Sequence, residues 1–273
     1  MTNSEFSDTF TTLLNSYNTQ AQFGKQASDR EIVLDEYEKS VLLTQAQDII
    51  VKSYFDGTLN SQRQGFDDSS RRQVDFSSLI KVATLQTSES ANSNFDDRGI
   101  LYDLPKKTSD TSTSSTEVLF ILNEKLIFTP QENPGFKQEF VIVPINYKEY
   151  DREMSKPYAQ PLKKQAWRLF QNTAVGFDLK TELIPRWDYK KAVAENHGVF
   201  TYKIRYIKRP QPIILENLPD GLEIDGEKNM KSCELNPIIH MDILNKAVEL
   251  AISSRGGAVS YRQPQQGNNQ ERS

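Results

Sequence analysis

An alternating segment that runs into two prolines restricts this fold more than any other part of the sequence. Every second residue of 199–207 is large and apolar, and the intervening positions include Lys203 and Arg205. This period of two predicts a strand with one buried face and a basic outer face. Pro210 and Pro212 lack an N–H and fix φ, so neither can lie inside a hydrogen-bonded ladder.

The segment that follows this strand is predicted to be a stiff, extended connector that presents Lys208 and Arg209 outward. Two prolines at an exposed strand end also guard against open-ended pairing between sheet edges. An ordinary surface crossover between strands is the alternative interpretation.

A long helix is predicted over residues 29–56, with a capping box at residues 28–31. Its apolar residues spread around most of the helix circumference, so more than one partner must bury them. A large core of the same chain could supply these partners, and so could neighbouring subunits. We expect a subunit interface that includes Leu43, Ile50, Tyr54 and Phe55.

Shorter patterns predict the other elements. The apolar spacing of residues 6–17 indicates a short amphipathic helix, and Asn236-Pro237 opens a C-terminal helix that ends at Gly256-Gly257. Between them we expect a hairpin that turns at residues 123–124, a strand over 138–146, a helix over 161–170 and a short strand over 221–226. The resulting prediction is an α+β fold, in which a long N-terminal helix and a C-terminal helix pack around a small, mainly antiparallel β region.

Three segments are expected along the chain. Residues 1–28 form an N-terminal arm or short helix, residues 29–258 form the α+β domain, and residues 259–273 form a polar C-terminal tail. The domain contains a low-complexity polar loop at residues 105–116, "PKKTSDTSTSST". Neither that loop nor the tail has the apolar residues needed to pack by itself.

The charge distribution is uneven. The 273 residues carry a net charge of −4, which argues against extensive nucleic-acid binding. Residues 152–210 nevertheless hold thirteen Lys and Arg against five Asp and Glu. A solvated face explains this balance, and so does a basic surface, formed by Lys203, Arg205, Lys208 and Arg209, that meets DNA or an acidic protein partner.

No motif for catalysis or for cofactor binding stands out. The sequence lacks the glycine-rich phosphate loops and the nucleophile elbow, and its two histidines and lone Cys233 are too scattered for a metal site. We therefore expect no enzyme activity, no cofactor and no metal. No apolar run reaches the roughly 20 residues of a membrane span.

Four segments together resemble a known family. They are "LDEYEKSVLLTQAQDIIVKSYF", "FVIVPINYKEYDREMSKPYAQPLKKQAWRLF", "YKIRYIKRPQPIILENLPDGLEIDG" and "CELNPIIHMDILNKAVELA", in this order. The set is similar to ring proteins of crAss-like, Bacteroides-infecting tailed bacteriophages, and more narrowly to the portal-proximal adaptor ring of the head-to-tail connector. The resemblance covers roughly residues 30–255.

This resemblance implies a virion structural protein of the neck, assembled in the host cytoplasm. It implies a homo-oligomeric ring of twelve subunits, built from residues 29–258, with a DNA channel and with the portal protein and further neck or tail rings as partners. DNA would pass through the lumen without sequence-specific binding. Two alternatives remain open: a nucleic-acid-binding or packaging accessory protein that uses the basic surface, and an enzyme of unrecognised type.

Overall fold

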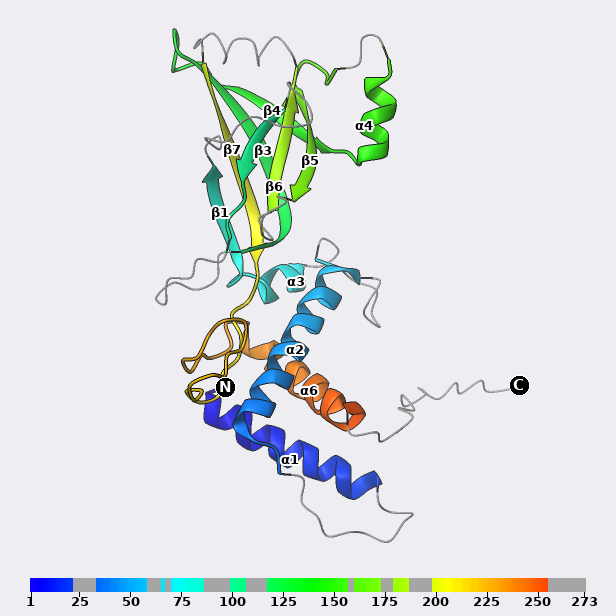
Figure 1. The fold of residues 1–273 in the computed structure, drawn as a ribbon, viewed down its shortest axis with the longest axis vertical. Coiled ribbons are helices and arrows are strands. Elements are labelled where there is room, and N and C mark those ends of the chain that lie inside the picture. Colours follow the sequence, from blue (N-terminus) through cyan, green and yellow to red (C-terminus); the bar gives the residue numbers. More distant parts are fainter. Residues whose placement is uncertain are drawn as a thin grey trace, which may run out of the picture. The chain divides into compact units, whose positions relative to one another are not determined.

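The chain forms two compact units, each with its own core (Figure 1). The computed structural model describes residues 1–21, 33–57, 65–66, 70–85, 99–106, 117–156, 160–172, 179–186 and 198–254. Residues 79–209 make up the sheet unit, and residues 1–78 and 210–273 make up the helical unit.

The described elements divide cleanly between the two units. The helical unit contains α1 (Asn3–Ala21), α2 (Glu36–Phe55), α3 (Ser70–Asp75), the 3₁₀ helix η2 (Pro237–Ile239) and α6 (His240–Ser254). The sheet unit contains β1 (Ile80–Leu85), β2 (Ile100–Asp103), β3 (Val118–Pro130), β4 (Gln138–Pro144), α4 (Tyr147–Met154), β5 (Gln165–Asn172), β6 (Leu179–Pro185) and β7 (Gly198–Lys208).

Helices α1, α2 and α6 contact one another around the core of the helical unit. The predicted stripe of α1 is confirmed at Phe6, Phe10 and Leu14, which are buried. The start of the C-terminal helix is also confirmed, because the side chain of Asn236 accepts a hydrogen bond from the backbone N–H of Ile238. The predicted buried stripe of α6 is confirmed at all of its residues: His240, Ile243, Leu244, Ala247, Val248 and Ala251.

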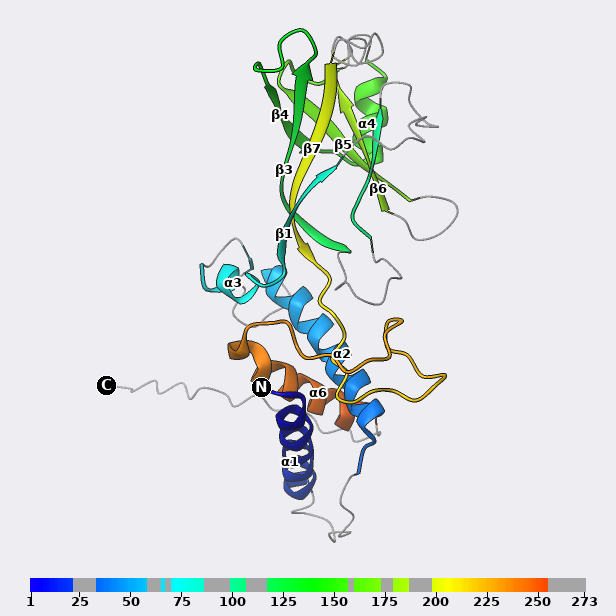
Figure 2. The same cartoon turned by 90° about the vertical axis from the view of Figure 1, so that its left-hand side faces the viewer.

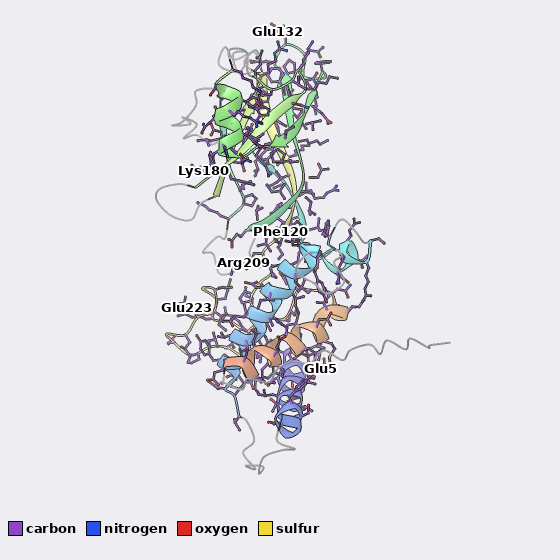
Figure 3. All side chains as sticks on the ribbon, turned by 90° about the vertical axis from the view of Figure 1, so that its right-hand side faces the viewer. Glu5, Phe120, Glu132, Lys180, Arg209 and Glu223 are labelled. Atoms are coloured by element: carbon purple, nitrogen blue, oxygen red, sulfur yellow. The ribbon has the colours of Figure 1, made fainter. Side chains whose placement is uncertain are left out.

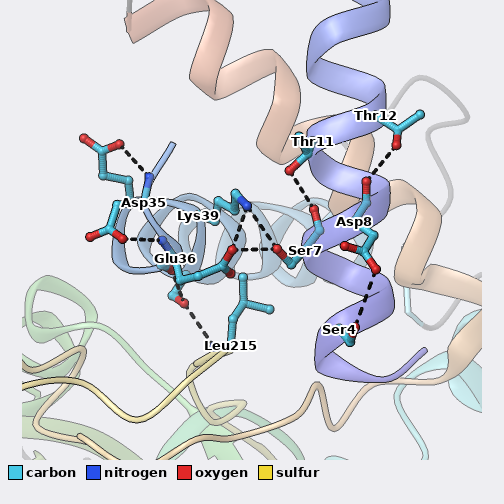
Figure 4. Close-up of polar contacts among 11 residues, drawn as sticks. Ser4, Ser7, Asp8, Thr11, Thr12, Asp35, Glu36, Lys39 and Leu215 are labelled. Atoms are coloured by element: carbon cyan, nitrogen blue, oxygen red, sulfur yellow. Dashed lines mark hydrogen bonds and ion pairs between the residues drawn. The ribbon is translucent and has the colours of Figure 1, made fainter. Parts of the chain in front are cut away.

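A small polar network joins the start of α2 to α1 (Figure 4). The Ser7 hydroxyl donates to Glu36 Oε1 at 2.8 Å, and Lys39 Nζ donates to Ser7 Oγ at 3.0 Å and to Glu36 Oε1 at 2.7 Å. Asp35 caps α2 in a capping box with Glu38. The helix therefore begins at Glu36, seven residues later than predicted, and the capping box expected at 28–31 lies outside the described residues.

The proline-containing segment after β7 lies along α2. Ser40, Thr44 and Gln47, spaced along one face of α2, are buried polar residues. The Ser40 hydroxyl accepts a hydrogen bond from the Leu215 backbone N–H, and the Thr44 hydroxyl accepts one from the Ile213 backbone N–H, both at 3.1 Å. Gln47 Nε2 donates a hydrogen bond to the Gln211 carbonyl at 2.8 Å. Side chains of a helix thus replace the strand partners that a segment with two prolines cannot use.

The sheet unit is built on one curled, mixed, seven-stranded sheet in the order β1-β7-β3-β4-β5-β6-β2. Among the described strands, only the β4–β5 pair is parallel. The concave side holds an apolar core to which Tyr102, Leu126, Phe140, Leu183 and Phe200 contribute. Strands β3 and β7 pair over almost their whole length, as both views of the fold show (Figure 2).

The curl lets the chain beyond β2 return to the start of β3, where the Val118 N–H donates to the Pro105 carbonyl at 3.2 Å. On the convex side, α4 covers part of the sheet, because Tyr150 packs with Leu169 of β5 and Ile184 of β6. Strands β1, β7, β3 and β4 keep exposed residues on that side, among them Val82 and Val141.

The predicted fold class is wrong. The β region is a seven-stranded mixed sheet rather than a small, mainly antiparallel one, and it has a core of its own. The N-terminal and C-terminal helices pack in a separate helical unit. The sequence pattern concealed this because several strands, such as β3 and β5, do not alternate regularly between apolar and polar residues.

Three local predictions are also wrong. Residues 165–172 form β5 instead of belonging to a helix, since the sheet buries Ala166 on one side and Leu169 on the other. No hairpin turns at Asn123-Glu124, because β3 continues through these residues with bulges opposite β7. Residues 221–226 make a tight turn at Asp225-Gly226, both with positive φ, closed by a single bridge between Ile224 and Glu227.

Replacing Thr44 with Val should destabilise the chain, since the near-isosteric side chain leaves the buried N–H of Ile213 without its acceptor. An unsatisfied buried donor costs about 1–3 kcal/mol. Urea unfolding of Thr44→Val is the measurement. Thr12→Val is the matched control, because Thr12 is exposed on α1 and its hydroxyl only supplements a helical carbonyl. Equal stability of the two variants would contradict the role of Thr44.

His240 should make the stability of the helical unit depend on pH. Burial lowers the pKa of His240, whose Nε2 lies 3.0 Å from the Leu235 carbonyl. Between this lowered pKa and the ordinary value near 6.5, only the unfolded chain binds the proton, so stability is present above pH 6.5 and is lost as the pH falls below it. The slope reaches at most about 1.4 kcal/mol per pH unit.

Unfolding curves between pH 5 and pH 7.5 check this expectation. The variant His240→Gln cannot titrate, so its stability should vary less over this range than that of the wild type. Identical pH profiles for the two proteins would exclude His240 as the source.

Candidate assembly surfaces

Two of the four predicted interface residues of α2 are buried within the chain itself. Leu43 and Ile50 are buried in the helical unit. The apolar circumference of α2 is thus covered in large part by α1, α6 and the segment after β7. Leu43 and Ile50 pack in the core of the helical unit. Their contact with a neighbouring subunit stays a prediction.

Tyr54 and Phe55 lie at the end of α2, where both are partly exposed. The Tyr54 hydroxyl donates to Asp242 Oδ2 of α6 at 2.5 Å, and the Arg72 guanidinium lies 3.6 Å from the centre of the Tyr54 ring. Burial, together with the bond to Asp242, raises the pKa of Tyr54. The Phe55 ring stacks on the Phe66 ring, and the ring centroids are 6.1 Å apart. This end of α2 is therefore a rigid, partly aromatic surface.

Lys203 and Arg205 occupy the exposed convex side of β7, as the alternation predicted. The register places Thr84 of β1 and Lys125 of β3 on either side of Lys203, and Val82 and Asn123 on either side of Arg205. Val141 of β4 continues the first of these rows beyond Lys125. We call the surface formed by Val82, Lys125, Val141, Lys203 and Arg205 the basic sheet face.

The charges of the basic sheet face are only partly neutralised by the chain. Lys125 forms an exposed ion pair with Glu139 at 3.1 Å. Within the described part of the chain, neither Lys203 nor Arg205 belongs to an ion pair. Lys203 lies directly opposite Lys125, and like charges in this position destabilise a sheet. Val82 and Val141, exposed by 67% and 64%, add apolar area between the cations.

The other two predicted basic residues are placed differently. The Lys208 side chain is 2% exposed, so the prediction that it points outward is wrong. The alternation ends there because the last three residues of β7 are all buried. Arg209 follows the strand, is partly exposed (Figure 3) and forms an ion pair with Glu117 at 3.7 Å. The four basic residues therefore do not share one surface.

The sequence interpretation missed Lys125, Val82 and Val141 as members of this surface. The signal was present in "NEKLIF", where Asn123 and Lys125 alternate with the inward residues Glu124 and Leu126. The assumed hairpin at 123–124 broke this pattern in two. Recognising one continuous strand would have placed Lys125 beside β7, but pairing partners cannot be read from one strand alone.

A partly buried ionic cluster of the sheet unit joins Tyr202, Glu124 and Arg168. Tyr202 Oη donates to Glu124 Oε2 at 2.6 Å, and Arg168 Nε lies 3.4 Å from Glu124 Oε1. Burial raises the pKa of Glu124, and the Tyr202 hydrogen bond and the Arg168 charge oppose this shift. A carboxylate held by two partners on a core face has the features of a structural ion pair.

Burial also limits the reactivity of Cys233. Burial raises the pKa of the Cys233 thiol to about 11, so the thiol stays protonated and is a poor nucleophile. In the described ranges, no group of three or more His, Cys, Asp or Glu side chains could bind a metal ion. None of the described helices is both long and apolar enough to cross a membrane.

Comparisons with known proteins agree with the resemblance seen in the sequence. Residues 1–262 match the family described as phage tail ring protein 3/4. Ring protein 4/5 of Bacteroides phage crAss001 is 42% identical over 257 residues, which cover 93% of this chain and 93% of that protein. Ring protein 3 of the same phage is 32% identical over 255 residues, which cover 93% of this chain and 96% of that protein.

These matches span both the helical unit and the sheet unit, so they concern the whole architecture and not one motif. The predicted relation to ring proteins of crAss-like phages is confirmed, whereas the position of the ring in the particle stays a prediction. The chain belongs to the phage tail ring protein 3/4 family and is a structural ring protein of a crAss-like phage.

Proposed function

We propose that this chain is the repeating subunit of a closed ring in the neck of the virion. The ring joins the portal to the tail, surrounds the channel through which DNA is ejected, and contains twelve copies. Its assembly takes place in the host cytoplasm, and its role is mechanical and not enzymatic. The observation that carries this proposal is the similarity to two ring proteins of one phage over 93% of this chain.

A ring subunit needs two different contact surfaces, one for each neighbour, because the contacts that close a ring are heterologous. The partly exposed end of α2 at Tyr54 and Phe55 is one candidate, and the basic sheet face is another. Within this proposal, residues 29–258 form the body of the ring, the N-terminal segment 1–28 adds the short helix α1 to it, and residues 259–273 form a tail that contacts a neighbouring component.

The portal protein and other neck or tail ring proteins are the proposed partners along the particle axis. DNA passes through the lumen with sparse contacts, because each phosphate neutralised by Lys or Arg adds affinity and several together would hold a moving duplex. Among the described residues of the sheet unit, Lys and Arg form six ion pairs, which fits this view because these cations would otherwise be available for DNA.

A nucleic-acid-binding or packaging accessory protein is the second candidate. The observation that favours it is the absence of ion pairs at Lys203 and Arg205 among the described residues. Such a protein binds DNA as a free subunit, with an affinity that falls steeply with salt concentration.

Native mass measurement and negative-stain microscopy of the purified chain, alone and with portal protein, test the proposal. We expect particles that contain twelve copies of the 31.3 kDa chain and have a central opening. Fluorescence anisotropy with duplex DNA in 50–200 mM salt should show little binding at micromolar concentrations. A chain that stays monomeric under both conditions and binds DNA in a salt-dependent manner would replace the ring proposal with the accessory one.

A further inference from the structure

The two units carry opposite net charge. Residues 79–209 hold twenty Lys and Arg against sixteen Asp and Glu, a net of +4, which leaves −8 on the rest of a chain whose total is −4. Opposite charges on two units of one subunit favour head-to-tail contact between copies, because the basic unit of each copy attracts the acidic unit of the next.

Five of the 21 Asp and Glu of the helical unit lie in one hairpin. Residues 216–228, "ENLPDGLEIDGEK", contain five Asp and Glu and one Lys. We call this segment the acidic hairpin; Figure 3 shows Glu223 on its outer part. Lys228 pairs with Glu223 at 3.5 Å, and Lys231 pairs with Glu227 at 3.3 Å. In the part of the chain that the structure describes, Glu216 and Asp220 belong to no ion pair, and both are exposed.

The acidic hairpin is held in one shape before any partner arrives. The Leu218 N–H donates to the Lys228 carbonyl at 2.9 Å, and Ile224 and Glu227 bridge across the turn. Its inner residues Leu218 and Ile224, together with Ile214 just before it, form a small apolar cluster against Tyr37 and Val41 near the start of α2. A fixed surface loses little conformational entropy on binding, so even modest charge attraction contributes to affinity.

The acidic hairpin and the basic sheet face also match in their apolar content. Leu222 and Met230 are exposed by 36% and 58% on and beside the hairpin, as Val82 and Val141 are on the sheet face. Apolar side chains within a charged surface are typical of the mixed composition of protein interfaces. A nucleic acid offers phosphates but no comparable apolar surface for these valines, which favours a protein occupant.

We propose that the acidic hairpin of one copy docks on the basic sheet face of the next copy around the ring, with Glu216 and Asp220 facing Lys203 and Arg205. This inference rests on the proposed ring function and specifies one of its contacts. The pairing is heterologous, so it repeats around the ring without needing any other component. Lys203 and Arg205 gain the anionic partners that the described chain does not give them.

A charge exchange tests this pairing in the full-length chain. Lys203→Glu with Arg205→Glu should weaken ring assembly at least tenfold in subunit dissociation constant, and so should Glu216→Lys with Asp220→Lys. The four substitutions together restore opposite charges across the contact and should recover most of the lost affinity. Analytical ultracentrifugation over a concentration series, in 0.1 M and 1 M salt, gives the dissociation constants, and the wild-type ring should weaken at the higher salt.

Lys137→Glu with Lys148→Glu is the matched control, because it makes the same change in net charge at two exposed lysines of the sheet unit outside the basic sheet face. This control should assemble like the wild type. If the wild type forms no ring, the proposed function itself fails. If the wild type forms rings but the four-fold exchange does not recover assembly lost in the paired variants, or if those paired variants assemble normally, the hairpin contact is refuted.

Discussion

Three polar side chains on one face of α2 hold the connection between the two units in its observed path. Ser40, Thr44 and Gln47 bind backbone groups of residues 211–215, and all three are buried. Without them this segment would have unsatisfied backbone groups, since Pro210 and Pro212 prevent it from extending the ladder of β7. The segment leads into the acidic hairpin, whose apolar side packs near the start of α2. One set of side chains thus determines where α2, the connector and the hairpin lie in the helical unit.

In the sheet unit, part of the sheet is buried on both sides although few helices pack against it. Curling encloses the concave side, where Tyr202 and Arg168 hold Glu124 beside a largely apolar core. In the part of the chain that the structure describes, helix α4 covers the convex side at β5 and β6. The convex side of β1, β7, β3 and β4 keeps exposed cations and valines, and this uncovered surface gives the molecule its most evident place for a partner.

Sequence patterns predicted best those elements in which the spacing of apolar residues, or the capping residue, matched the side chains that the structure buries or caps. The alternation of residues 199–207 and the cap at Asn236 are examples, because each reports a local geometry directly. The patterns failed at β5, where Ala166 faces the sheet core and Leu169 faces α4. Two apolar residues three positions apart match a helix as well as a strand buried on both sides. The choice depends on the neighbouring strands β4 and β6, which lie outside the window that a local pattern samples.

The sequence by itself determined the family, the polarity of each face of β7, the extended path after Pro210 and the start of the C-terminal helix, whose expected end at Gly256-Gly257 lies outside the described residues. It also placed Lys203 and Arg205 on an exposed face, because alternation fixes which side chains share a side. Only the tertiary structure decided that Lys208 is buried, that Lys125 lies opposite Lys203, and that Leu43 and Ile50 are covered by their own chain. Pairing register and helix packing join residues far apart in the chain, and such contacts depend on the whole arrangement of elements and not on local propensity.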